Sequence, residues 1–215
     1  MAGRKRSRDV AEGRERDAGL SRRAFLKGAG SVAAGGALIQ EVAAEAASPS
    51  RTIDGATTIE FTLNGAKTEV EVEPRTTLLS ALRSHLAIPH TAAKEVCDQG
   101  SCGACTVLLD DEPVCACMTL AVLVHGRAVR TVEGLAVNGE LTPVQRAIAA
   151  EDGTMCGFCT PGFVMSMTAC VERNPAASAQ ELREACRGNL CRCGTYPHLF
   201  RAAERVSREL TEEIR

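Results

Sequence analysis

The stretch Cys97-Asp98-Gln99-Gly100-Ser101-Cys102-Gly103-Ala104-Cys105 places three cysteines in one short loop, and Cys117 follows with eleven residues in between. Iron-sulfur clusters and zinc both select thiolate ligands, but C-x₄-C-x₂-C with a distant fourth cysteine is the plant-type 2Fe-2S spacing. Common four-thiolate zinc sites use two C-x₂₋₄-C knuckles instead. The spacing therefore favours a 2Fe-2S cluster over zinc at this loop.

The fourth ligand of this first set is not decided by spacing. Cys115 and Cys117 lie on either side of Ala116, and a turn could bring either thiol to the metal. Gly100 and Gly103 have a clearer role. A loop around a metal-sulfide core turns tightly and directs backbone N–H groups at sulfur, and glycine permits the positive φ angles that such turns need.

A second cysteine set consists of two pairs, Cys156 with Cys159 and Cys191 with Cys193. A C-x-x-C pair alone is typical of a thioredoxin-like dithiol or of half a zinc knuckle, but no βαβ unit surrounds this pair, and C-x-C is an unusual zinc spacing. Each pair is expected just before a helix, where the helix dipole favours deprotonated sulfur. The set favours a second iron-sulfur cluster, with zinc as the alternative.

Two domains are expected, and the first covers residues 57–133. Polarity alternates on both sides of Asn64-Gly65, a pair preferred in two-residue hairpin turns, so residues 58–63 and 68–72 are predicted to form a hairpin. Leucines at helical spacing predict a short helix over residues 77–86, and a strand is expected over residues 106–109.

The second domain is expected to cover residues 141–213 and to be a bundle of four short helices. Thr142-Pro143 predicts the start of the first helix, and Ser178 with Glu181 forms a capping box for the third. The second helix is predicted over residues 163–173, the third ends at Gly188, and the fourth covers residues 199–210.

Composition argues for small domains and against nucleic-acid binding. The 215 residues include no Trp, one Tyr and five Phe, so each domain has modest core material that a bound metal cluster would supplement. Residues 47–215 hold 16 Lys and Arg against 21 Asp and Glu. An acidic, aromatic-poor body lacks the phosphate-neutralising surface and the stacking platforms of nucleic-acid binders.

The N-terminal residues 1–47 have the pattern of a twin-arginine export signal and linker. Arg22-Arg23 precedes Phe25-Leu26-Lys27 and a Gly/Ala-rich run, and Ala44-Glu45-Ala46 offers a cleavage site. This signal predicts a periplasmic protein that is exported folded, with its thiols already occupied. The apolar run is too short and glycine-rich to span a membrane. A dinucleotide-fingerprint match within residues 28–33 has no preceding strand and carries no weight.

Three long motifs resemble one family. Residues 94–107, residues 156–162 and residues 188–194 are similar to the iron-sulfur subunit of the xanthine dehydrogenase and aldehyde oxidoreductase family of molybdenum hydroxylases. The resemblance implies an α+β protein, with a β-grasp 2Fe-2S ferredoxin domain followed by a helical 2Fe-2S domain. It implies Cys97, Cys102, Cys105 and Cys117 as ligands of the first cluster, and Cys156, Cys159, Cys191 and Cys193 as ligands of the second.

The resemblance also implies a function and partners. A molybdenum cofactor in a separate large subunit would oxidise an aldehyde or an N-heterocycle, and this chain would pass the electrons to an FAD-binding medium subunit or to a cytochrome acceptor. No catalytic residue is expected on this chain. Where family members often have a Gln that contacts the molybdenum cofactor, this chain has Met155, so that contact is not carried over. The two rivals are a zinc-stabilised interaction module and a free-standing ferredoxin.

The remaining cysteines and the histidines are assigned no ligand role. The cysteines are expected to be small hydrophobic residues, with Cys186 a second choice as a bundle ligand. The histidines occur singly and are expected to be surface or structural residues. These residues are Cys115, Cys170 and Cys186, and His85, His90, His125 and His198.

Overall fold

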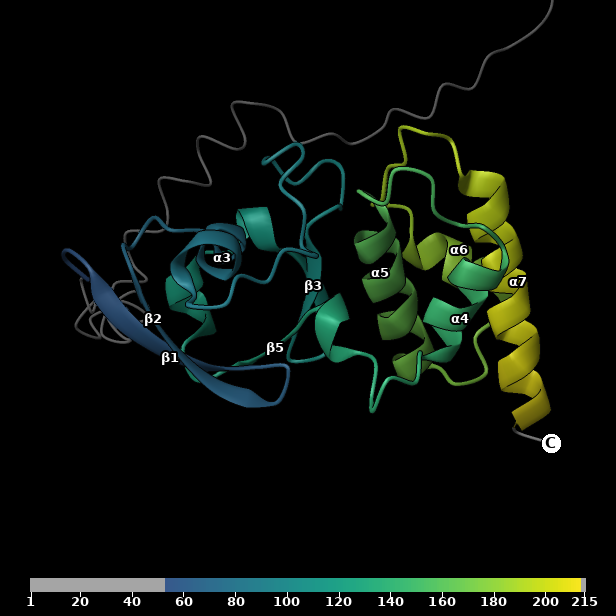
Figure 1. The fold of residues 1–215 in the computed structure, drawn as a ribbon, viewed down its shortest axis with the longest axis horizontal. Coiled ribbons are helices and arrows are strands. Elements are labelled where there is room, and N and C mark those ends of the chain that lie inside the picture. The colour runs from purple at the N-terminus through teal and green to yellow at the C-terminus, as the bar shows by residue number, and fades with distance from the viewer. Residues whose placement is uncertain (1–52, 214–215) are drawn as a thin grey trace, which may run out of the picture. The chain divides into compact units, whose positions relative to one another are not determined.

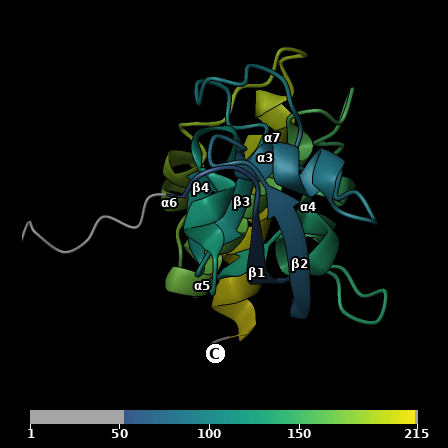
Figure 2. The same ribbon diagram turned by 90° about the vertical axis from the view of Figure 1, so that its left-hand side faces the viewer.

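The hairpin forms where the alternation predicts it. The structure, a computed structural model, describes residues 53–213, and the expected export signal lies outside them. Strand β1 (Thr57–Leu63) pairs antiparallel with β2 (Ala66–Val72), and both turn residues, Asn64 and Gly65, have positive φ. The apolar residues of both strands are buried, which confirms the predicted hairpin. Figure 2 shows the two strands side by side.

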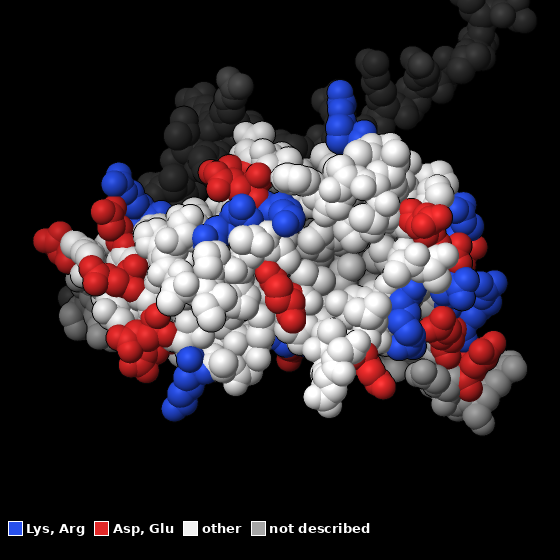
Figure 3. All heavy atoms as spheres, in the orientation of Figure 1, with Lys and Arg blue, Asp and Glu red and all other residues white. Residues whose placement is uncertain are grey.

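The sheet has five strands in the order β2-β1-β5-β3-β4. Strands β3 (Thr106–Leu109) and β4 (Glu112–Cys115) form a second hairpin, and β5 (Ala128–Arg130) lies parallel to β1 and antiparallel to β3. The edge strand β2 and its neighbour β1 carry outward glutamates, seen as red side chains at one end of the face in Figure 3. Charge on an edge strand discourages pairing with a second molecule.

Short helical segments cover the sheet. The predicted helix at residues 77–86 is α3 (Leu78–Ser80), capped by Thr77, and it continues as the π-helical segment Ala81–His85. Three 3₁₀ turns follow, at Ala116–Met118, Ala121–Val124 and Val132–Gly134. The leucines of the first segment are buried in a core that includes the apolar face of β1 and β2.

Four helices form the second half, as predicted, with different bounds. They are α4 (Pro143–Ala150), α5 (Thr160–Arg173), α6 (Ala179–Ala185) and α7 (Tyr196–Glu213). Helices α5 and α7 begin three residues earlier than predicted, because Pro161 and Pro197 each fit a first helical turn. The predicted end of α6 at Gly188 is wrong, since the last helical residue is Ala185 and Cys186 is the C-cap.

Helix α5 joins the sheet to the other helices. It lies between β3 and helices α4 and α6 (Figure 1). Strand β3 is buried on both faces: Leu108 belongs to the helical core, while Val107 and Leu109 belong to the sheet core. A strand covered on both sides has a continuous apolar sequence, as Thr106-Val107-Leu108-Leu109 does.

Ion pairs connect the C-terminal end of α5 to the sheet. Arg130 on β5 pairs with Glu172 and with Asp111, and Arg173 pairs with Glu112. Both cores belong to one compact unit that begins at Ile53. Among the helices of residues 53–213, none is long and apolar enough to cross a membrane.

Candidate metal centres

The first cysteine set gathers where the loop of residues 97–105 enters β3. The thiol of Cys97 lies close to that of Cys102, and the thiol of Cys105 lies close to that of Cys117, which is in the 3₁₀ turn after β4. Strand pairing explains this approach, since Thr106 on β3 lies opposite Cys115 on β4.

Backbone N–H groups in this loop are directed at sulfur. The Gln99 N–H and then the Ser101 hydroxyl donate to Cys97 and lower the pKa of its thiol to about 6. Gly100, at φ +73°, directs its N–H to Cys117, so the predicted role of this glycine is confirmed. Burial nevertheless raises the pKa of Cys117 to about 11. The loop therefore supplies donors that would stabilise bound thiolates.

The structure separates the two candidates for the fourth position. Both Cys115 and Cys117 reach the thiol of Cys105, and burial raises the pKa of Cys115 as well. Cys117 additionally accepts the Gly100 N–H, so it contacts the middle of the cysteine loop as well as its end at Cys105. This geometry favours Cys117 as the fourth ligand.

The second cysteine set also forms two pairs. The thiol of Cys156 lies close to that of Cys193, and the thiol of Cys159 lies close to that of Cys191. The Phe158 N–H donates to Cys156 and lowers the pKa of its thiol. The hydrogen bond with Cys156 raises the pKa of Cys193.

Cys191 has the densest surroundings in this set. Its sulfur lies 3.1 Å from the Thr195 hydroxyl and 3.4 Å from the Thr195 backbone N, while its own N–H donates to the Tyr196 hydroxyl at 2.8 Å. Burial raises the pKa of this thiol, but the hydrogen bonds from Thr195 bring it down to about 7. The sequence analysis did not predict these roles of Thr195 and Tyr196, although two polar residues that follow Cys193 after one glycine were the available signal.

The expected effect of the helix dipole does not hold for Cys159. This residue is the N-cap of α5, where the dipole should favour deprotonated sulfur. Burial instead raises the pKa of its thiol to about 12, and the hydrogen bond with Cys191 adds to the increase. Burial is therefore the largest influence on the pKa of this thiol.

Each cysteine set supplies two pairs of thiols. Within residues 53–213, no three His, Cys, Asp or Glu side chains are grouped closely enough to hold one metal ion. Two thiol pairs at each site are the ligand set of a 2Fe-2S cluster, in which each iron takes two protein ligands. Two such sets, each with N–H donors at sulfur, could hold two clusters.

The other cysteines and two of the histidines have structural surroundings. Cys186 is buried in the helical core, and burial raises the pKa of its thiol to about 12. Cys170 packs against the same core. The ring of His125 accepts the Glu60 N–H at 3.1 Å, and the ring of His198 lies 2.8 Å from the Glu151 carbonyl oxygen.

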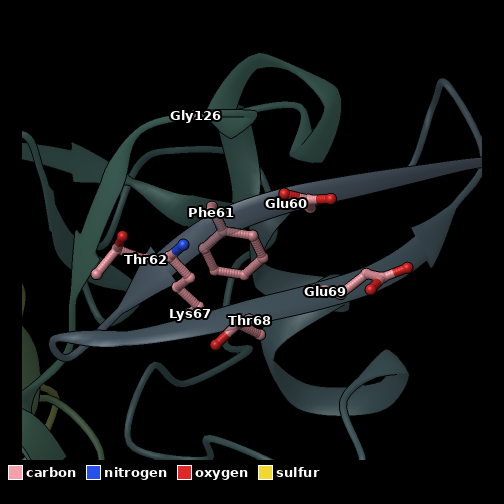
Figure 4. A pocket seen from close by; sticks show the side chains of 7 residues that line it. All are labelled: Glu60, Phe61, Thr62, Lys67, Thr68, Glu69 and Gly126. Atoms are coloured by element: carbon pink, nitrogen blue, oxygen red, sulfur yellow. The ribbon is translucent and has the colours of Figure 1, made fainter.

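A hollow of about 420 Å³ lies on the hairpin of β1 and β2 (Figure 4). Its lining residues are Glu60, Phe61, Thr62, Lys67, Thr68, Glu69 and Gly126. None of these seven carries a thiol or an imidazole, and Phe61 belongs to the sheet core. The metal-binding chemistry of this chain lies with the cysteines.

Two known domain families match the two halves. Residues 61–122 match the 2Fe-2S iron-sulfur cluster binding domain, and residues 131–204 match the 2Fe-2S binding domain. The aldehyde oxidoreductase iron-sulfur-binding subunit PaoA of Escherichia coli O157:H7 is 35% identical over 210 residues, which cover 90% of this chain and 91% of PaoA. The nicotine 6-hydroxylase small subunit of Paenarthrobacter nicotinovorans is 43% identical over 67% of this chain and 86% of that subunit.

A much longer relative and a solved structure are also similar to this chain. Aldehyde oxidase 2 of Rattus norvegicus is 46% identical over 150 residues, and the matched part is 64% of this chain but only 11% of that protein. A chain of quinoline 2-oxidoreductase from Pseudomonas putida 86 superposes with a TM-score of 0.68 at 37% identity, covering 74% of this chain and 98% of that one.

Proposed function

This chain belongs to the iron-sulfur subunits of the xanthine dehydrogenase and aldehyde oxidoreductase family of molybdenum hydroxylases, and from that membership we propose its function. It passes electrons from a molybdenum cofactor in a partner subunit to a flavin or another acceptor. The overall reaction hydroxylates an aldehyde or an N-heterocycle. The observation that carries the proposal is the meeting of eight cysteines in four thiol pairs at two sites.

The ligands that we propose follow from those pairs. In the first site Cys97 and Cys102 would share one iron, and Cys105 and Cys117 the other. In the second site the pairs are Cys156 with Cys193 and Cys159 with Cys191. A 2Fe-2S cluster bound there accepts one electron at a time, so two clusters divide a two-electron oxidation into single steps. The N–H and hydroxyl donors of this chain stabilise the extra negative charge at sulfur.

An exposed apolar rim beside the cysteines supports a permanent partner. Five large apolar side chains are each more than half exposed and each adjoins a proposed ligand in the sequence. They are Val96, Met118, Met155, Phe158 and Leu190. Exposed apolar side chains that gather around one feature mark an interaction site. We propose that the molybdenum-binding subunit covers this rim, with Met155 in place of the family's frequent Gln.

Export in the folded state is also part of the proposal. The match to PaoA covers 90% of the chain and therefore includes residues before Ile53, where the twin-arginine pattern lies. The twin-arginine route would deliver the protein to the periplasm with its thiols already bound to iron. Cell fractionation of the native host tests this, and retention in the cytoplasm contradicts it.

Metal analysis of the complex from its native host tests the function. We expect about four iron and about four acid-labile sulfide per chain, with two distinct signals in electron paramagnetic resonance (EPR) spectra after reduction. We also expect a large molybdenum-containing subunit to co-purify. Zinc without sulfide would contradict the clusters. A solitary, fully reducible monomer would contradict the partner.

Thr195 should tune the second cluster. Its hydroxyl stabilises negative charge at Cys191, so Thr195→Val should lower the reduction potential of that cluster. A hydrogen bond of about 1 kcal/mol corresponds to on the order of 40 mV for one electron. Redox titration followed by EPR measures the shift. Thr160→Val is the matched control, because that hydroxyl contacts Thr154 rather than sulfur, and equal shifts in both variants would contradict the assignment.

A further inference from the structure

The two cysteine sites are in direct backbone contact. Leu190, which precedes Cys191, donates its N–H to the carbonyl oxygen of Cys102 at 2.9 Å. Only covalent bonds and this one hydrogen bond therefore separate a proposed ligand of the first cluster from a proposed ligand of the second. The geometry of this contact sets how the two sites lie relative to one another.

A buried asparagine holds that contact in place. Asn189 donates its side-chain N–H to the carbonyl oxygen of Gly103 at 3.0 Å and lies 3.4 Å from the hydroxyl of Thr106. Its side-chain oxygen accepts the hydroxyl of Ser166 on α5 at 2.8 Å. The side chain thus connects the loop of the first site, the central helix and the segment that leads into the second site.

Burial makes these hydrogen bonds consequential. Asn189, Ser166 and Thr106 are buried, with 5%, 6% and 7% of their surfaces exposed. A buried polar group that loses its partner bears its full desolvation cost, since water cannot replace the lost bond. The network should therefore be either fully formed or disrupted together with the packing around it.

Glycines let the three segments approach this closely. A Cβ at Gly103 would lie 2.5 Å from both the Asn189 side-chain nitrogen and the Gly188 carbonyl oxygen. A Cβ at Gly162, near the start of α5, would overlap the Gly103 carbonyl oxygen. The backbone of the first cysteine loop therefore packs directly against the backbone of residue 188 and of α5. The side chain of Asn189 occupies the space between these segments.

We propose that Asn189 is a positioning residue that fixes the loop of Cys102 against the segment of Cys191 and thereby sets electron transfer between the two clusters. Asn189 acts through the Leu190 to Cys102 hydrogen bond, and its own side-chain hydrogen bonds go to Gly103, Thr106 and Ser166 rather than to sulfur. This inference rests on the proposed function, because it presumes that both sites hold iron.

The test compares Asn189→Leu with the wild-type complex purified from its native host. Hydrogen exchange read by mass spectrometry follows the Leu190 amide, and we expect its exchange to be on the order of tenfold faster, since a buried hydrogen-bond network is lost. In reduced samples, EPR should still show both cluster signals. The splitting that arises from the magnetic interaction between the two clusters should be smaller or less well defined than in the wild type. The rate of electron transfer between the clusters should fall with it.

Two further variants decide between positioning and general destabilisation. Asn174→Leu is the matched control, because Asn174 bonds Glu181 and Ala176 within the helical half and should leave the Leu190 amide unchanged. Ser166→Ala keeps the amide of Asn189 and should give a smaller effect of the same sign. If Asn189→Leu fails to fold, the exchange of the Leu190 amide and the cluster interaction in Ser166→Ala test the proposal instead.

The inference is overturned if the Leu190 amide and the cluster interaction stay as in the wild type while both clusters are present. An equal effect of Asn174→Leu overturns it too. Absence of iron in the wild-type protein would overturn the proposed function instead, so the two failures are distinguishable.

Discussion

Replacing Cys117 by alanine is expected to remove the first 2Fe-2S cluster and to leave the second intact. Cys117 pairs with Cys105 and accepts the Gly100 N–H, so its loss removes one of the two thiolates of an iron and the closure of the loop. Iron and sulfide should fall from about four to about two per chain, because each 2Fe-2S cluster holds two of each. One of the two EPR signals should disappear.

Cys115→Ala is the matched control for this experiment. Both thiols contact Cys105 and in both the pKa is raised by burial, so a difference between the variants isolates ligation. Alanine is used because the oxygen of a serine could replace the sulfur. The Cys115 variant should keep both clusters. If it loses the first cluster while Cys117→Ala retains it, the assignment of the fourth ligand is reversed.

The sequence predicts what depends on short-range rules. Asn64-Gly65 with alternating polarity located the first hairpin, and Thr142-Pro143 located the start of α4. Residues 106–109 were expected as a strand and form β3. In each case the local residues alone determine the conformation, because turn chemistry, capping and the apolar period act within a few residues.

Other elements depend on partners far along the chain. The turn between β3 and β4 consists of Asp110 and Asp111, both at positive φ, which an aspartate pair signals far less clearly than Asn-Gly. Strand β5 has three residues and is defined by its pairing with β1 and β3. Such short strands carry little local signal, so the sequence alone did not predict them.

In the candidate site, too, some features follow from local sequence and others depend on residues far along the chain. Cysteine spacing separated the two ligand sets, yet it could not choose between Cys115 and Cys117. It also gave no indication that Asn189 reaches Gly103, which lies 86 residues earlier in the chain. The predicted stop of α6 at Gly188 failed for the same reason, because that segment turns to meet the first cysteine loop. Long-range packing, which no local pattern encodes, decides these points.

Replacing Gly103 by alanine is expected to destabilise strongly the contact between the first cysteine loop and the segment that leads to Cys191. Gly103 has φ +67°, a conformation that costs a residue with a Cβ about 1–2 kcal/mol. The new Cβ would lie 2.5 Å from the Gly188 carbonyl oxygen and from the side chain of Asn189, and forcing backbone apart adds about 1–3 kcal/mol. A total near 3 kcal/mol corresponds to a fall in melting temperature on the order of 10 °C. Thermal unfolding of the complex measures it.

Gly126→Ala separates the two contributions to that loss. Gly126 has φ +75°, close to that of Gly103, but no atom lies within 4 Å of the position its Cβ would take. It should therefore show the conformational cost alone, roughly 1–2 kcal/mol. Equal losses in the two variants would mean that the close approach at Gly103 contributes nothing. A larger loss at Gly103, with faster exchange of the Leu190 amide in that variant alone, would locate the difference at the contact between the two cysteine sites.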